Sequence, residues 1–187
     1  MVDVLGHFAM ALLWALPAWY RWDGRASLAF VGFVASTAML PDVDLALRAV
    51  LPGVHHHGVT HTVVFVAGVA LVAGVVVARG LLPAIERWWV ESEGHAVPRA
   101  EAYAFVVGGL LVGGLSHVFA DVLSAPDVAS PVEPLWPLVD APISVDVIYY
   151  TAPEWNGGLL LVALGLHAVA GYVDGRRLRR VTNRFGR

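Results

Sequence analysis

Five long apolar stretches, separated by short polar segments, dominate the chain. They cover residues 4–20, 26–40, 62–82, 102–123 and 157–173. A straight helix needs about 20 apolar residues to cross the hydrocarbon core of a bilayer, and only the stretch at 26–40 is clearly shorter. Glycine pairs interrupt the stretch at 102–123, and small residues allow membrane helices to pack closely. We therefore predict an all-α fold, a polytopic membrane bundle of about five helices.

The composition supports a membrane location. The 187 residues are 58% hydrophobic and 14% charged, whereas an ordinary soluble domain has about 25% charged residues. Too few polar side chains are available to cover a buried core, although a soluble metal-binding helical bundle remains an alternative. A net charge of −3 argues against a nucleic-acid partner. The length fits one integral-membrane domain at 1–175 followed by a basic tail at 176–187.

The arginines indicate how the chain is oriented in the membrane. All 12 basic residues are arginine. Placing the C-terminal tail in the cytoplasm puts eleven of them on that side, in the tail and in the loops that contain Arg21, Arg25, Arg79, Arg87 and Arg99. Only Arg48 then lies outside, as the positive-inside rule predicts. We expect a cell-membrane protein with a cytoplasmic C-terminus and a proline-rich outer loop at 124–155 that covers a site on the outer face.

Histidine and aspartate interrupt the apolar frame in four places, all at the predicted outer ends of helices. The candidate metal ligands are His7, Asp42, Asp44, His56, His61, His117 and Asp121. His117 and Asp121 are four residues apart and therefore share one helix face. His56 and His61 are five apart, which places His56 on a loop and His61 on a first helical turn.

The residue types indicate which ions could bind. Imidazole together with carboxylate suits zinc, manganese or iron, and zinc is favoured. One tetrahedral zinc takes four ligands, so seven candidates suggest two ions, or one ion plus general acid/base groups.

Each of these four groups of histidine and aspartate also has a purely structural interpretation. His7 and His167 could be hydrogen-bonded packing residues, and Asp42 and Asp44 could be solvated turn residues. The run of histidines could lie on the surface, as we expect for His55. The pair at His117 and Asp121 is harder to explain in this way, because a buried carboxylate is costly unless it is paired or bound to metal.

The order of these polar motifs along the chain resembles that of the YdjM-like family of predicted membrane-bound metal-dependent hydrolases. The matching pieces are GH at 6–7, LPDVD at 40–44, HHGVTHT at 56–62, LSHVFAD at 115–121 and PLWP at 134–137. The family is distantly similar to zinc-dependent phospholipases C and related nucleases, which implies hydrolysis of phosphate esters. The family usually has His-Arg-Gly where this chain has His56-His57-Gly58. An arginine could clamp a phosphate oxygen with two hydrogen bonds, whereas His57 could do so only singly, and best when protonated.

These observations predict a membrane-embedded hydrolase with one or two divalent metal ions. Asp44 would be a bridging ligand or the general base, and His57 would contact the phosphate. The partners of this protein would be the lipid bilayer and a lipid or other amphiphilic ester. The alternative is a non-catalytic metal-binding scaffold or a metal transporter, although transporters place polar groups nearer the membrane midplane. The oligomeric state is left open.

Overall fold

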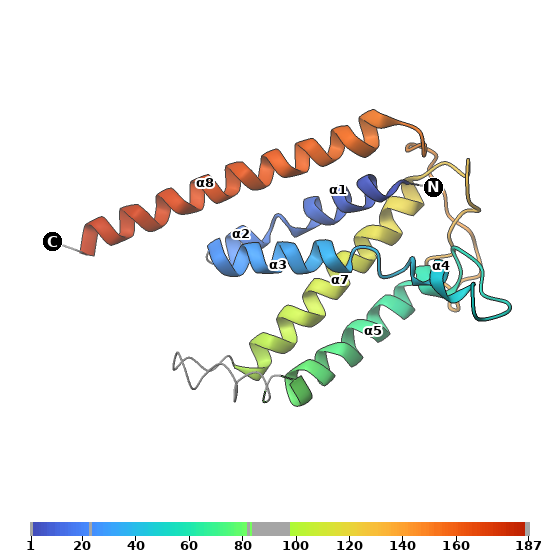
Figure 1. The fold of residues 1–187 in the computed structure, drawn as a ribbon, viewed down its shortest axis with the longest axis horizontal. Helices are drawn as coiled ribbons and strands as arrows, with labels where there is room; N and C mark the ends of the chain where they lie inside the picture. Colours follow the sequence, from blue (N-terminus) through green and yellow to red (C-terminus); the bar gives the residue numbers. More distant parts are fainter. Residues whose placement is uncertain (1, 23, 82, 84–97, 186–187) are drawn as a thin grey trace.

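The computed structural model describes residues 2–22, 24–81, 83 and 98–185, excluding the side chains of 176–185. The described residues form helices and irregular segments with no strand, so the all-α prediction is confirmed (Figure 1). The longer helices are α1 (Val4–Ala15), α3 (Gly24–Thr37), α5 (Val63–Val76), α7 (Arg99–Leu123) and α8 (Leu159–Phe185). The shorter ones are α2 (Ala18–Arg21), η1 (Val59–His61), α4 (Val43–Leu47), η2 (Val77–Leu81) and η3 (Glu154–Gly158).

Helix α7 holds the bundle together, because it packs against α1, α3 and α5. Helix α1 lies between α7 and α8 and also contacts α3. One end of the bundle gathers the start of α1, the short α4, the start of α5 and the end of α7 (Figure 1). Residues from four distant parts of the sequence therefore meet there.

Among the described residues, three helical segments are long and apolar enough to cross a membrane: Val63–Leu81, Arg99–Leu123 and Glu154–Gly175. The other two predicted membrane helices are shorter. Helix α1 has 12 residues and ends before Pro17, whose ring and missing N–H interrupt a helix. Helix α3 has 14 residues, or about 21 Å of length, compared with a hydrocarbon core of about 30 Å. The five expected helices are thus present, but only three have the length of a span.

Two glycines on α7 lie in close contact with the neighbouring helices. A Cβ atom at Gly113 would lie 2.9 Å from the carbonyl oxygen of Val34 and closer still to Thr37 Oγ1, both on α3. A Cβ atom at Gly114 would lie 2.7 Å from the Val66 side chain on α5. These contacts leave no room for a methyl group and fix α7 against both neighbours.

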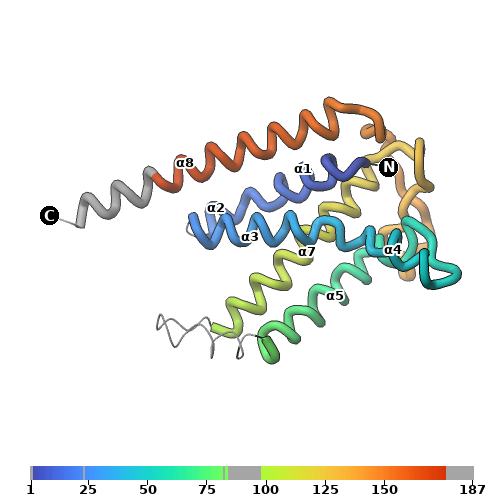
Figure 2. The backbone as a smooth tube through the Cα atoms, in the orientation of Figure 1, coloured from blue at the N-terminus to red at the C-terminus, as the bar shows by residue number. Residues whose placement is uncertain are grey.

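The segment between α7 and η3 is irregular but tied down by backbone hydrogen bonds, and it crosses the same end of the bundle (Figure 2). Ala125 N–H donates to the Ile148 carbonyl at 2.8 Å, and Ile143 N–H donates to the Val132 carbonyl at 2.9 Å. Its role as a cover on the outer face stays a prediction, as does the domain boundary at 175, since α8 continues through that position. The predicted cytoplasmic loop containing Arg87 lies outside the described residues.

Candidate metal centre

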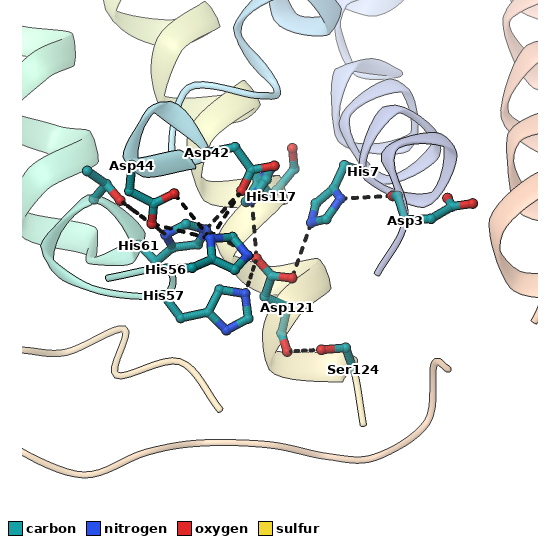
Figure 3. Close-up of polar contacts among 12 residues, drawn as sticks. Asp3, His7, Asp42, Asp44, His56, His57, His61, His117, Asp121 and Ser124 are labelled. Carbon is teal, nitrogen blue, oxygen red and sulfur yellow. Dashed lines mark hydrogen bonds and ion pairs between the residues drawn. The ribbon is translucent and has the colours of Figure 1, made fainter. Parts of the chain in front are cut away.

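The structure brings all seven predicted ligands together at one end of the bundle, with His57 among them (Figure 3). We call this group the His/Asp cluster. His7 comes from α1, two aspartates from the α4 segment, three histidines from the loop and η1 that precede α5, and two residues from the end of α7. Its members are His7, Asp42, Asp44, His56, His57, His61, His117 and Asp121.

His7 is held by the first turn of α1. The Asp3 side chain caps this helix by accepting a hydrogen bond from Gly6 N–H at 2.9 Å, and the Asp3 carbonyl accepts the Nδ1–H of His7, also at 2.9 Å. A Cβ atom at Gly6 would clash with Val2 and with Asn156, a buried residue of η3. Gly6 therefore allows α1 to sit where His7 Nε2 points into the cluster, and no signal in the sequence pointed to Asn156.

Asp44 orients two further imidazoles. The Nδ1–H of His56 donates to Asp44 Oδ1 at 3.1 Å. His61 Nδ1 lies 3.1 Å from the hydroxyl oxygen of Thr60 and 3.2 Å from Asp44 Oδ2, and the Thr60 hydroxyl itself donates to Asp44 Oδ2 at 3.1 Å. These contacts place the ring protons on Nδ1 and leave both Nε2 lone pairs free to act as ligands. Carboxylates hydrogen-bonded behind metal-binding histidines commonly orient the rings in this way.

His57 adopts a backbone conformation that is uncommon for a residue with a side chain. Its φ is +63°, in the left-handed region, which turns its ring inward. Its Nδ1–H donates to the Ser130 carbonyl at 2.5 Å, and its Nε2 lies 3.8 Å from Asp121 Oδ2. Burial lowers the pKa of His57 to about 4, so the ring is neutral at pH 7. The geometry groups His57 with His56 and His61 as potential ligands.

Four ligand atoms in the cluster form a closed ring of contacts in which imidazole nitrogens alternate with carboxylate oxygens. Asp42 Oδ1 lies 3.3 Å from both His61 Nε2 and His117 Nε2. Asp121 Oδ2 lies 3.2 Å from His117 Nε2 and 3.7 Å from His61 Nε2. A tetrahedron with zinc–nitrogen and zinc–oxygen bonds of about 2.0–2.2 Å has edges of about 3.3–3.5 Å. Three of the four separations lie within about 0.1 Å of this range, as expected of neighbouring ligands of one ion, and the fourth is slightly longer.

Three of these four atoms, and three further nitrogens of the cluster, lack hydrogen-bond partners within the described structure. The buried, unpaired side-chain atoms in the cluster are His56 Nε2, His57 Nε2, His61 Nε2, both ring nitrogens of His117, and Asp121 Oδ2. An unsatisfied buried polar atom costs about 1–3 kcal/mol. One cation bound by His61 Nε2, His117 Nε2 and Asp121 Oδ2 would satisfy three of these atoms at once.

Two carboxylates of the His/Asp cluster, Asp42 and Asp44, are held in the charged state. Burial alone would raise the pKa of Asp42, but the imidazoles of His117 and His61, each with a nitrogen 3.3 Å from Asp42 Oδ1, outweigh burial and keep the pKa well below its ordinary range. For Asp44, hydrogen bonds from His61 and His56 likewise outweigh burial and lower the pKa to about 2. Burial disfavours the charged form of His61, yet the close carboxylates of Asp42 and Asp44 raise its pKa overall. Both carboxylates are therefore ionised at neutral pH and available to a cation that displaces protons from the neighbouring imidazoles.

Asp121 lies between two groups of ligands. Its Oδ1 lies 3.2 Å from His7 Nε2, whereas its Oδ2 faces His57, His61 and His117. The His7 ring stacks on the His117 ring with centroids 3.8 Å apart. A carboxylate with both oxygens directed at different imidazoles can bind one ion or bridge two.

The two remaining described histidines do not join the cluster. His55 is exposed and lines a cavity beside it. His167 in α8 uses both ring nitrogens elsewhere: Trp19 Nε1–H donates to its Nδ1 at 2.8 Å, and its Nε2–H donates to the Leu12 carbonyl at 2.9 Å. This is the hydrogen-bonded packing role considered from the sequence.

A helical bundle with apolar spans and a buried His/Asp cluster at one end defines a class, the membrane proteins with a potential metal centre. Residues 1–183 match the family model of the YdjM inner membrane protein. The chain belongs to this family, as the order of its motifs predicted. No curated protein and no solved structure matches the chain, so the expected similarity to phospholipase C stays a prediction.

Proposed function

We propose that this chain is a membrane-embedded, metal-dependent hydrolase that cleaves a phosphate ester of a lipid or another amphiphile. One observation carries the proposal, the set of buried imidazole nitrogens that converge with an Asp121 carboxylate oxygen without hydrogen-bond partners. The phosphate-ester class comes from the family resemblance.

His61, His117, Asp42 and Asp121 are the ligands that we propose for one ion, with zinc favoured over manganese or iron. His7, His56 and His57 lie beside these ligands and could bind a second ion, with Asp121 shared between the two ions. A bound divalent ion lowers the pKa of a coordinated water to about 7 and so provides hydroxide at neutral pH.

The hydrogen bonds of Asp44 favour a different role from the bridging ligand or general base predicted from the sequence. Its oxygens already contact His56, His61 and Thr60. We propose that Asp44 is a positioning residue, which acts through the two imidazoles that it orients. For His57, a neutral ring with Nε2 toward Asp121 favours a ligand over the phosphate-clamping role expected from the family pattern.

Two non-catalytic functions compete with this proposal. A scaffold would hold metal without turnover. A transporter would need further polar groups along the bundle, but His167, the histidine farther along α8, is saturated by Trp19 and Leu12. The scaffold is therefore the stronger rival, and an activity assay separates it from the hydrolase.

The orientation of the site is also a proposal. The arginine distribution favours a cytoplasmic C-terminus and a cluster on the outer face of the membrane. Because the chain contains no cysteine, one cysteine introduced at Val50 can be tested in intact cells with a membrane-impermeant maleimide. We expect labelling without permeabilisation. Labelling only after permeabilisation would show that the cluster faces the cytoplasm instead.

The first experiment measures bound metal per chain by elemental analysis after purification in detergent. We expect one to two equivalents of zinc or manganese in the wild type, and loss of metal when His117→Ala and Asp121→Ala are combined. His55→Ala is the matched control, because His55 is an exposed neighbour of the cluster, and it should retain the metal. If wild-type protein reconstituted with zinc binds none above background, the hydrolase proposal fails.

The second experiment tests turnover with the metal-loaded protein in lipid vesicles. Phosphate release or head-group release from a panel of phospholipids is compared between wild type, the metal-free protein and the double variant. Activity that depends on both metal and cluster supports the hydrolase. Stoichiometric metal with no turnover on any lipid phosphate ester supports the scaffold.

A further inference from the structure

A cavity of about 450 Å³ lies beside the His/Asp cluster. Its lining includes His57, Val59 and Thr62 on one side and Ser130, Glu133 and Trp136 on the other. His57 connects the two regions, because its ring lines the cavity while its Nε2 points into the cluster. A molecule in this cavity would have one end next to the proposed ions.

One wall of the cavity belongs to an ordered turn with exposed apolar side chains. We call residues 134–139 the apolar turn. Leu138 N–H and Val139 N–H both donate to the Leu135 carbonyl, at 2.9 and 3.1 Å. Leu138 is nevertheless 80% exposed and Trp136 39% exposed, and Leu135 and Val139 are also exposed. A backbone that is fixed in this way presents the apolar side chains outward as a constant surface, which signals an interaction site.

The apolar turn is continuous with the surface of a membrane-spanning segment. Val63, the first residue of α5, donates its N–H to the Pro134 carbonyl at 2.9 Å. The span Val63–Leu81 has a mean hydropathy of 2.3 and is only 22% buried within the protein. Val63 and Val64 are exposed on its first turn. The lipid-facing side of α5 therefore passes directly onto the apolar turn.

The chemistry of the cavity points to the hydrocarbon part of a ligand. Among the described residues that line it, the titratable side chains are His55, His57 and Glu133, and none is an arginine. Nothing in this lining provides the bidentate contacts with which arginine binds phosphate. Val59 and Trp136 offer apolar contact instead. Affinity in the cavity would come from buried hydrocarbon, and the ester group would be held at the cluster.

We propose that the apolar turn sits among the acyl chains of the leaflet at this end of α5, and that the cavity receives an amphiphile laterally from the bilayer. The membrane contact stands on the geometry alone. The delivery of an ester to the cluster rests on the proposed function. An amphiphile entering between η1 and the apolar turn would place its head group beside His57 and its chain against Trp136.

The membrane contact can be measured without any catalytic activity. The chain contains no cysteine, so a single nitroxide label at Leu138→Cys reports one position in protein reconstituted into phosphatidylglycerol/phosphatidylcholine nanodiscs. Collision rates with oxygen and with a water-soluble nickel chelate give its depth. Val72→Cys, a 65% exposed position on α5, is the lipid-facing reference, and Val139→Cys is a second variant of the turn. We expect both turn positions to favour oxygen over nickel, as Val72 does. If both collide with nickel more often than with oxygen, the proposal is overturned.

The cavity is tested with two probes on the zinc-loaded protein, dodecylphosphonate and methylphosphonate. We expect dodecylphosphonate to bind at least about tenfold more tightly, because each buried CH₂ contributes about 0.8 kcal/mol. Trp136→Ala should reduce that advantage severalfold while leaving methylphosphonate binding and metal content unchanged. Equal affinity of the two probes would refute lateral delivery. A turn in lipid without any hydrolysis would leave the membrane contact standing and refute only the hydrolase.

Discussion

Substituting Gly113 by alanine tests whether helix packing positions the metal site. Gly113 lies on α7 one turn before His117, and it faces α3, which leads into Asp42. The new Cβ atom would lie 2.9 Å from the Val34 carbonyl oxygen and nearer still to Thr37 Oγ1. The hydroxyl can rotate away, but the backbone carbonyl can move only with α3. The two helices must therefore separate by several tenths of an ångström, which changes the spacing between His117 and Asp42.

The magnitude follows from two opposing effects. Forcing an extra methyl group into a close-packed contact costs about 1–3 kcal/mol, whereas replacing glycine by alanine in a helix gains about 1 kcal/mol. The net loss for Gly113→Ala is about 0–2 kcal/mol. Gly165 on α8 is the matched control, because its Cβ would meet nothing within 4 Å. Gly165→Ala should keep the helical gain of about 1 kcal/mol, so the two variants should differ by the full packing cost.

Thermal unfolding followed by circular dichroism in detergent measures this difference. For a chain of this size, 1 kcal/mol corresponds to about 2–4 °C, so Gly113→Ala should unfold several degrees below Gly165→Ala. It should also bind zinc more weakly than the wild type, whereas Gly165→Ala should bind it equally well. The reasoning fails if Gly113→Ala unfolds at the temperature of Gly165→Ala with unchanged zinc affinity.

Three further predictions follow from individual contacts. Asp44→Asn should leave the protein folded but weaken zinc binding about 10–100-fold, measured by chelator competition; unchanged affinity would exclude the positioning role. The raised pKa of His61 means that zinc must displace a proton, so affinity should increase as pH rises above about 6.5, with a calorimetric enthalpy that depends on the ionisation enthalpy of the buffer. Thr62→Ala removes the oxygen that caps α5 by accepting from Phe65 N–H at 3.1 Å, and should cost about 1 kcal/mol of stability in thermal unfolding.

The sequence predicts the helical elements well because apolar runs and their polar ends are local features. Pro17 also marks locally where the first apolar stretch breaks into α1 and α2. The length of α3 is a different matter, since its residues after Thr37 are apolar yet leave the helix to carry Asp42 toward α7. Which apolar stretches are true spans thus depends on the tertiary contacts that each one makes.

The candidate ligands could be selected from the sequence because each lies at the end of an apolar stretch, where a charged or imidazole side chain is conspicuous. His57 was assigned to the substrate because the family places arginine there. Its inward direction depends on a positive φ and on the Ser130 carbonyl, 73 residues away. Asn156 and Gly6 meet across about twice that number of residues. No local pattern encodes such pairings, so they become visible only in the folded structure.

Hydrogen-bond accounting separates a packing histidine from a potential ligand where residue type cannot. His167 and His117 both lie on long apolar helices and both are histidines in a protein poor in polar groups. Pro17 ends α1 so that Leu16 N–H donates to Leu13 rather than to Leu12, and the Leu12 carbonyl accepts His167 instead. His167 therefore has no free nitrogen lone pair with which to bind an ion. His117 has two buried nitrogens without a hydrogen bond, and its Nε2 faces two carboxylates. The same reasoning predicts that His167→Asn, which keeps a donor and an acceptor, retains full metal content, whereas His117→Asn loses it.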